Sequence, residues 1–225
     1  MNMEEAKMEN PWKNLEKAND EYIAVCDKEH ITPALRRDFA FDTLPWPYMG
    51  DPNKAVVYVL AKSAMYEHTR GLGTVADKEK AIMHNLKQSH DSRLPLIPLD
   101  ERFDETDFQR WWIKKLGGIA GFDAVAEFVF VAQYYSYSHH SRIGRHEILP
   151  SQHYTHGLVE KAMKAGKIIV PMYAKKEWYK AIPRLRNYEK CYTLTPTGAD
   201  INRSTIGSDN FEKIVKAIKS AKNCD

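Results

Sequence analysis

Four short apolar runs, separated by segments with helical periodicity, constrain the fold of this chain more than any other feature. They lie at residues 55–60, 128–132, 167–170 and 191–194. The runs have the length of strands and are rich in β-branched residues, and continuous apolar character indicates strands that are covered on both faces. Strands that alternate with helices pair in parallel, with helices on both sides of the sheet. The sequence therefore predicts a three-layer α/β/α fold around a central, mainly parallel four-stranded sheet.

The segments between these runs carry the periodicity and end signals of helices. Thr106 and Gln109 match a capping box, which predicts a helix start at that point. Ser151 has the side chain of a helix N-cap and predicts another start. The prolines within residues 33–52 predict an extended, turn-rich approach to the first strand. Further helices are expected at residues 11–29, 75–89 and 175–182, and from residue 208 onward.

Length and composition favour one domain without a membrane span. For 225 residues, a single α/β domain over residues 1–225 is the most economical arrangement, with residues 1–50 as a helical and extended segment packed on it. No apolar run approaches the roughly 20 residues that a bilayer-crossing helix needs. The polar, acidic residues 1–10 lack the pattern of a signal peptide. We therefore expect a cytoplasmic protein with no membrane partner.

Cysteine and histidine spacing argues against a metal centre. The three cysteines lie far apart and form no C-x-x-C pair, which favours a reducing compartment. Five histidines between residues 139 and 156 lack a compact spacing with carboxylates or thiolates. The sequence therefore predicts no metal site and no cofactor. The formal net charge of +3 is too small to indicate a nucleic-acid partner unless cations cluster locally.

Polar side chains follow each expected strand, at the edge where α/β sheets bind ligands. They include Lys62, Ser63 and Tyr66 after the first run, Gln133, Tyr134 and Arg142 after the second, Lys175 after the third, and Thr195 and Arg203 after the fourth. Amides, hydroxyls, aromatic rings and cations suit a planar, hydrogen-bonding ligand with a phosphate better than they suit a metal. The tyrosines also fit ordinary packing at the rim of a core, so both interpretations stay open here.

The loop after the fourth run reads Thr-Pro-Thr-Gly-Ala-Asp from Thr195, and Arg203, Gly207 and Phe211 follow it. It resembles the last motif of the uracil-DNA glycosylase superfamily, a His-Pro-Ser-Pro-Leu-Ser segment followed by Arg, Gly and Phe at the same offsets. Gln133, an amide after an apolar strand, is similar to the family's base-reading Asn. The resemblance implies the fold of that family, with a nucleobase cleft at the carboxyl ends of the strands.

The residues that act in that family are replaced in this chain. The resemblance places Ser63 at the position of a water-positioning Asp and Thr195 at the position of a catalytic His, while Ala199 replaces an intercalating Leu. A serine cannot supply the negative charge that helps stabilise the cationic sugar as the glycosidic bond breaks. The resemblance therefore implies that standard uracil excision is absent or very slow, although some members of the family act without the Asp.

The resemblance implies two functions of different classes, and the histidines suggest a third. The replaced groups favour a protein that binds a nucleobase, a nucleotide or DNA without cleaving it. The alternative is an active, divergent DNA glycosylase, and the third hypothesis is a hydrolase that uses the histidine-rich residues 139–156. The residues that the resemblance assigns are Ser63 and Thr195 as weak catalytic candidates, Gln133, Tyr66 and Tyr134 for the base, and Lys62, Arg142 and Arg203 for phosphates.

Overall fold

A mixed four-stranded sheet forms the centre of the computed structural model, which describes residues 9–88, 96–141, 143–144, 146–195 and 200–224. In spatial order its strands are β2 (Tyr48–Met49), β4 (Val129–Gln133), β3 (Val57–Ala61) and β6 (Ile168–Pro171). β3 pairs in parallel with β4 and with β6, and β2 pairs antiparallel with β4. Every residue of β3, β4 and β6 is buried, which confirms the expectation of strands covered on both faces.

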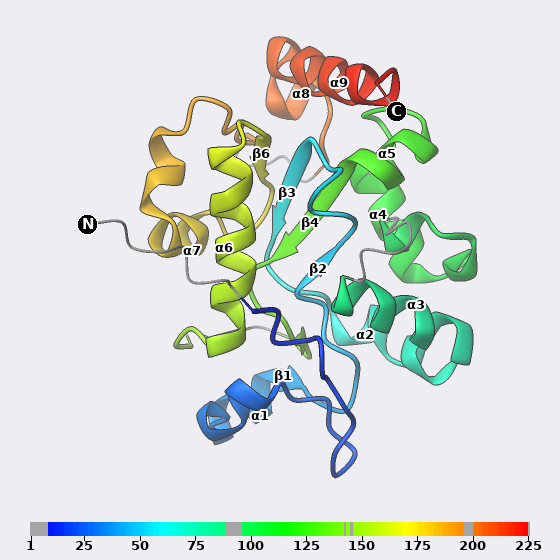
Figure 1. Ribbon diagram of the computed structural model, residues 1–225, viewed down its shortest axis with the longest axis vertical. Helices are drawn as coiled ribbons and strands as arrows, with labels where there is room; N and C mark the ends of the chain where they lie inside the picture. The colour runs from blue at the N-terminus through cyan, green and yellow to red at the C-terminus, as the bar shows by residue number, and fades with distance from the viewer. Residues whose placement is uncertain (1–8, 89–95, 142, 145, 196–199, 225) are drawn as a thin grey trace.

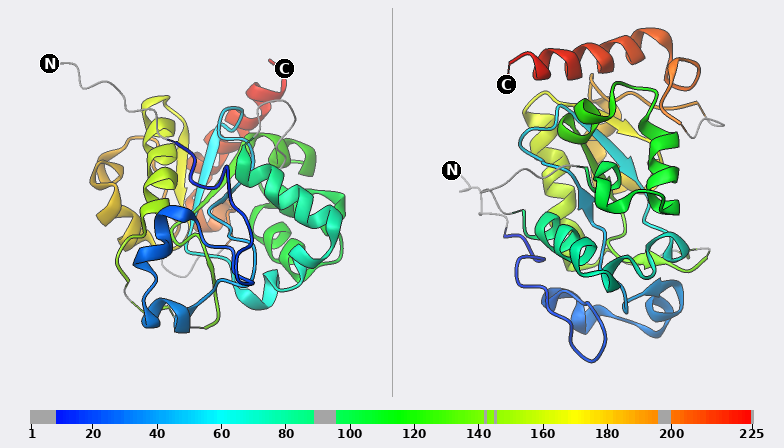
Figure 2. Two further views of the ribbon diagram at one scale, coloured as in Figure 1. Left: turned by 60° about the horizontal axis from the view of Figure 1, so that its bottom comes forward. Right: turned by 90° about the vertical axis from the view of Figure 1, so that its right-hand side faces the viewer.

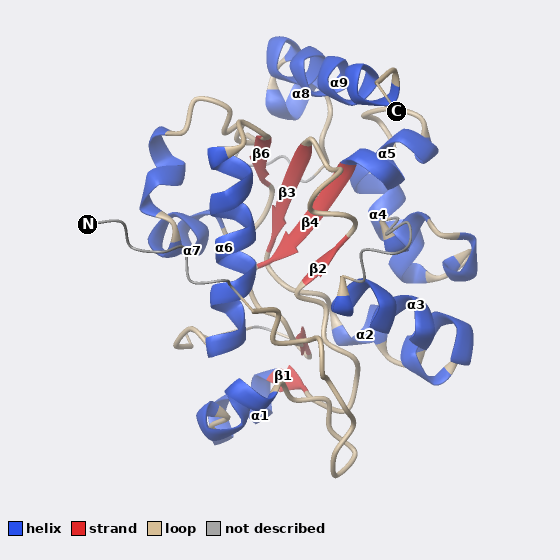
Figure 3. Ribbon diagram, viewed as in Figure 1, coloured by secondary structure: helices blue, strands red, loops and turns tan. Residues whose placement is uncertain are grey.

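Helices lie on both sides of this sheet, so the expected α/β class with parallel strands is confirmed (Figures 1, 2 and 3). On one side α6 (Pro150–Lys164) packs against β4 and β6. On the other side α5 (Phe122–Phe128) contacts β4, and α9 (Ser208–Lys222) contacts β3. Within the described ranges, every helix is too short or too polar to cross a lipid bilayer.

The other elements are short and surround this core. The helices are α1 (Pro33–Asp38), α2 (Tyr66–Thr69), α3 (Ala76–Lys87), α4 (Asp107–Leu116), α7 (Lys175–Ala181) and α8 (Arg203–Ile206). The 3-10 helices are η1 (Val25–His30), η2 (Leu72–Thr74), η3 (Ile97–Leu99), η4 (Glu101–Phe103) and η5 (Pro183–Asn187). A separate two-stranded sheet pairs β1 (Phe39–Ala40) with β5 (Ser138–His139). The helices expected at 75–89, 175–182 and from 208 are confirmed to within two residues at the ends that the structure defines.

The expected fourth parallel strand, at residues 191–194, is wrong, and β2 supplies the fourth strand instead. Only one bridge forms there, with Ile169 opposite Cys191. Ile169 donates its N–H to the carbonyl of Lys190 and accepts from the N–H of Tyr192, both at 2.9 Å. The next pairing residue of β6 would be Pro171, which has no N–H to donate. The ladder therefore stops after one bridge, and the chain diverges from the edge of the sheet.

The expectation of a helix at residues 11–29 is also wrong. Asn19 and Asp20 have φ angles of 51° and 62°, which a right-handed helix does not allow. Ala18 and Glu21 exchange two backbone hydrogen bonds across this pair and close a tight turn. The apolar residues of this segment therefore belong to an irregular stretch of chain, in which only η1 is helical.

The helix that follows β4 is capped by a residue from the amino-terminal segment. Ser151 was expected as its N-cap, but α6 begins at Pro150 and the Ser151 hydroxyl has no hydrogen-bond partner among the described residues. The fully buried Asp27 accepts from the backbone N–H of Ser151 at 2.9 Å and from the Tyr137 hydroxyl at 2.7 Å. A carboxylate at this end satisfies a free N–H group and the helix dipole. By contrast, Thr106 does cap α4 by accepting from the N–H of Gln109.

Candidate functional site

An enclosed cavity of about 290 Å³ lies where the parallel strands β3 and β4 end. The carboxyl ends of parallel strands meet at one edge of a sheet, where ligands of α/β proteins bind. Ala61 and Gln133 are partners in the last register of β3 and β4, so both strands deliver side chains to the same point. The described residues that line the cavity are Ala61, Lys62, Ser63, Ala64, Met65, His68, Phe108, Trp111, Trp112, Gln133, His139 and Tyr173.

Gln133 carries a buried side-chain amide at this cavity, and the amide oxygen lacks a hydrogen-bond partner among the described residues. The residue is 1% exposed, and its backbone N–H is fixed by the carbonyl of Pro47 at 2.8 Å. Its side-chain Oε1 has no partner among the described residues. Buried amides are nearly always hydrogen-bonded, because an unsatisfied polar group costs about 1–3 kcal/mol. The carboxyl end of β4 therefore holds a buried carbonyl oxygen without a partner at the cavity.

Aromatic rings form the walls around this amide. Trp111 and Trp112 of α4 meet edge to face, with ring centroids 4.7 Å apart. Trp111 also stacks on Tyr173, which follows β6, at 6.1 Å and 29°. Phe108 lines the same side one helical turn earlier. Rings in this arrangement favour a flat ligand that can stack on one face and bond through its edge.

Ser63 and His139 form a hydrogen-bonded pair at the rim of the cavity. The Nδ1 atom of His139 lies 2.8 Å from the Ser63 hydroxyl and 2.8 Å from the carbonyl of Ala64. A carbonyl can only accept, so we assign the proton of the neutral ring to Nδ1. Burial lowers the pKa of His139, against the opposing effect of the bond to Ala64, and this favours the neutral ring. His139 therefore cannot act as a base toward Ser63 through Nδ1.

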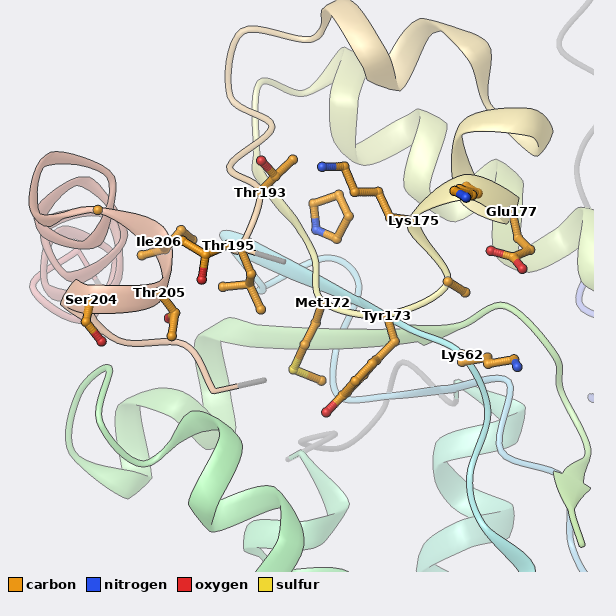
Figure 4. Close-up of a pocket in the computed structure, with 15 residues that line it drawn as sticks. Lys62, Met172, Tyr173, Lys175, Glu177, Thr193, Thr195, Ser204, Thr205 and Ile206 are labelled. Atoms are coloured by element: carbon orange, nitrogen blue, oxygen red, sulfur yellow. The ribbon is translucent and has the colours of Figure 1, made fainter. Parts of the chain in front are cut away.

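A larger, more open cleft of about 1010 Å³ adjoins the cavity, and Lys62 and Tyr173 line both. Its other residues come from the segments that follow β6 and surround α8 (Figure 4). Figure 4 shows Lys175 reaching toward Thr193, with Lys62 beyond Tyr173. Hydroxyls of Thr193, Thr195, Ser204 and Thr205 lie along the side formed by α8 and the segment before it. The lysines suit an anion, but the carboxylate of Glu177 also lines the cleft. The hydroxyls of Ser204 and Thr205 already donate to Asn202 and to the carbonyl of Asp200.

The loop singled out in the sequence is anchored at both of its described ends. The N–H of Thr195 donates to the carbonyl of Thr205 at 2.8 Å. Beyond the loop, Asp200 forms an ion pair of 2.7 Å with Lys115, which lies on α4. Asn202 then caps α8 by accepting from two backbone N–H groups. Pro196, Thr197, Gly198 and Ala199 lie outside the described residues.

The structure brings some of the expected site residues together and separates others. Gln133 and Ser63 share the enclosed cavity, Lys62 borders both spaces, and Thr195 lines the open cleft. Tyr66 lies outside both and meets His140 edge to face at 4.8 Å.

Two further expected residues, Tyr134 and Arg203, do not line the two spaces. Tyr134 packs against Trp178 at 5.4 Å in the core. Arg203 also lies outside, where it pairs with Glu212. Arg142 is outside the described residues.

The sequence reasoning missed the aromatic walls and one member of the hydrogen-bonded pair. The helix that carries Trp111 and Trp112 was expected, but no site role was predicted for these residues or for Tyr173. His139 was considered as a metal ligand and as part of the histidine-rich residues 139–156 of the hydrolase hypothesis, but not as a partner of Ser63.

The histidines of residues 139–156 do not converge on one site. His139 lies at the cavity, whereas His146 pairs with the buried Asp38 of α1 at 2.8 Å. His153 and His156 lie on α6, and their rings are 6.2 Å apart. No group of three His, Cys, Asp or Glu residues within the described ranges is placed to hold a metal ion.

Comparisons with known proteins add no relative to this picture. No protein-family model, no curated protein and no solved structure matches the chain. The chemistry of the cavity and of the adjoining cleft is therefore the basis for a proposed function.

Proposed function

We propose that this protein is uracil-DNA glycosylase-like and binds a nucleobase, free or as part of a nucleotide or DNA, in the cavity at the carboxyl ends of β3 and β4. The observation that carries the proposal is the buried amide of Gln133, whose oxygen has no partner among the described residues. A side-chain amide offers a donor and an acceptor in one plane, which matches the edge of a base. A bound base would supply the hydrogen-bond partner that the described residues do not give to the Gln133 amide oxygen.

The size and walls of the cavity support a base-sized ligand. Small-molecule sites usually span roughly 300–1,000 Å³, so a cavity of about 290 Å³ lies at the lower limit and suits a single heterocycle. Trp111 and Tyr173 provide stacking faces, and base stacking on aromatic rings contributes about 1–3 kcal/mol per base.

The adjoining cleft supports a phosphate on the same ligand. Lys62 borders both spaces, so a cation stands where a sugar-phosphate would leave the cavity. Lys175 and the hydroxyls beside α8 continue the polar lining away from the base. This polar path also agrees with a nucleotide that belongs to a DNA strand.

The lining of the cavity supports binding rather than cleavage. Its described residues include no Asp or Glu, so no carboxylate faces the place where a cationic sugar would form. Ser63 hydrogen-bonds to His139, whose Nδ1 is a donor and cannot activate it. We therefore propose a binding protein, with slow glycosylase activity as the alternative that the experiment below also examines.

The deciding experiment replaces Gln133 with methionine, which keeps the volume and removes the amide. We expect calorimetric affinity for uracil, deoxyuridine and deoxyuridine monophosphate, with adenine counterparts as a comparison, to fall about tenfold or more in Gln133→Met. The melting temperature without ligand should stay equal or rise, because a buried unsatisfied group is lost.

The matched control is Gln152→Met. Gln152 is equally buried, but it donates to the carbonyl of Tyr134 and accepts from the N–H of Leu149. This control should lower stability by about 1–3 kcal/mol and leave ligand affinity unchanged where the variant is folded. Unchanged affinity in Gln133→Met, or no binding by the native chain, would overturn the proposal. Release of uracil from a uracil-containing oligonucleotide would favour the glycosylase alternative.

A further inference from the structure

A second groove, of about 690 Å³, lies at the opposite end of the same sheet edge. It is formed by residues that precede β3 and β6, by residues 189–192, and by one side of α9. Figure 1 shows α9 across this end of the sheet, away from the carboxyl ends that form the nucleobase cavity. The groove therefore shares no lining residue with the cavity or with its adjoining cleft.

Four lysines and one glutamate line this groove: Lys167, Lys190, Lys213, Lys216 and Glu189. Their formal charge of +3 equals the net charge of the whole chain. A local cluster of cations, which the overall charge of the sequence did not reveal, is therefore present at one place. Such a cluster is the electrostatic footprint of an anionic partner.

These four lysines differ from the paired cations elsewhere on the molecule. Within the described ranges, none of the four has a carboxylate within ion-pair distance. Lys167 and Lys190 donate to backbone carbonyls, and Lys213 lies 5.6 Å from the ring centre of Tyr192. Neutral groups thus contact three of the four lysines, and Glu189 is the one carboxylate among the described residues that line the groove.

The cationic surface continues beyond the groove along α6. A neighbouring hollow of about 260 Å³ shares Ala165 and Lys167 with the groove and extends it to Lys161. Burial lowers the pKa of Lys167, Asp51 partly opposes this, and the charge of Lys161 lowers it further. Crowded cations of this kind favour an anion with several charges over a single one.

We propose that this groove binds the phosphodiester backbone of a nucleic acid strand without reading its sequence. Several separated lysines suit a polymer with a phosphate at every unit, because each contact releases a counterion. A membrane surface fits less well, because Phe211, Ile214 and Ile218 of α9 are buried in the core and cannot insert into lipid. The groove can hold a strand whether or not the distant cavity binds a base.

The test is fluorescence anisotropy with a labelled 20-nucleotide oligothymidine strand at several salt concentrations. We expect Lys213→Glu/Lys216→Glu to weaken binding about 30-fold or more at low salt. The slope of log affinity against log salt should fall by about 1.4, at roughly 0.7 for each lost contact with a single strand. Lys213→Gln/Lys216→Gln should give an intermediate loss, and it serves as the test if the charge-reversed variant does not fold.

The matched control, Lys80→Glu/Lys87→Glu, makes the same change in net charge on exposed residues of α3. It should alter binding by less than about threefold. Gln133→Met should keep the salt slope of the native chain, because it removes no charge. The groove and the proposed nucleobase site can therefore fail separately. Equal weakening in both charge variants, or binding of phosphatidylserine vesicles without binding of the strand, would overturn the proposal.

Discussion

The two ends of the β6 edge differ in almost every physical respect, although the same stretch of chain, residues 189–195, contributes to both. At the carboxyl end Thr193, Leu194 and Thr195 face a cleft that leads into an enclosed, aromatic cavity. At the amino end Lys190 and Tyr192 face an open, lysine-lined groove. Both spaces exist because Pro171 ends the ladder after one bridge, so no complete strand fills the edge.

The two ends differ in how far their ligand-binding groups are buried, and this affects how selectively each end can recognise a ligand. At the carboxyl end the amide oxygen of Gln133 has no partner among the described residues, which costs stability and makes its unmet hydrogen bond selective. At the amino end Lys190, Lys213 and Lys216 are exposed, so they cost little stability and distinguish only charge. We therefore infer that the carboxyl end of the β6 edge discriminates between ligands, whereas the amino end recognises only negative charge.

The largest expected effect is a loss of unfolding free energy in acid. It concerns a residue that packs beneath the carboxyl end of the β6 edge. His156 packs between Tyr134 and Trp178, and Trp178 donates to the carbonyl of Ala61, the last residue of β3. Burial, with a smaller contribution from His153, lowers the pKa of His156 to about 4. The unfolded chain takes up a proton below about pH 6.5, whereas the fold resists it until about pH 4, so stability falls between these values.

The expected loss at pH 5, relative to pH 7, is about 2 kcal/mol of unfolding free energy for His156. His156→Phe should remove that part of the pH dependence, as measured by urea unfolding at both pH values. An unchanged pH profile in His156→Phe would show that His156 is not the group that destabilises the carboxyl end in acid.

The next effect concerns the aromatic side of the cavity formed by Trp111. It tests whether the two ends of the edge bind their ligands independently. Trp111→Ala removes a ring that packs on Trp112 and Tyr173. Nucleobase affinity should fall about tenfold, from the loss of one stacking face. Binding of the oligothymidine strand to the groove should not change, and Trp111→Phe should recover most of the loss. Equal losses for both ligands would mean that the two ends are not independent.

The smallest expected effect concerns the boundary between the cavity and the open cleft. Lys62→Ala should reduce the affinity for a nucleoside monophosphate about fivefold, through loss of one contact to a charged group. Affinity for the nucleoside without phosphate should stay the same, and the loss should shrink at high salt. Calorimetry with both ligands at two salt concentrations measures this difference. A loss that is equal for the two ligands would place Lys62 at the base and not at the phosphate.

The strands and their order along the chain could be read from the sequence because burial on both faces leaves a local signature. β3, β4 and β6 are continuous apolar runs, and the side chains at their carboxyl ends, Gln133 and Ser63, follow directly from that position. The edge could not be read in the same way. Whether residues 191–194 pair along their length depends on Pro171 of the neighbouring strand, which is a tertiary fact.

The other wrong predictions have the same cause. In each case a residue that is distant in the sequence decides the structure at a place where the local pattern indicated something else. The stripe at residues 11–29 looked helical, yet Asn19 and Asp20 form a turn and the apolar residues anchor to other elements. Ser151 looked like a cap, yet Asp27 does the capping. Trp111 looked like core, yet Tyr173 from another loop turns it into a cavity wall.

The bond between Asp27 and Ser151 also determines where the chain can be shortened. The turn at Asn19 and Asp20 is open to solvent, with the Asp20 side chain 94% exposed. A boundary drawn there would still remove the fully buried Trp12, whose ring meets that of Tyr137 at 5.8 Å. A boundary drawn after His30 would take away the carboxylate on which the first turn of α6 depends, 124 positions further on. The smallest piece of this protein that can hold α6 intact therefore includes η1, far from α6 in the sequence.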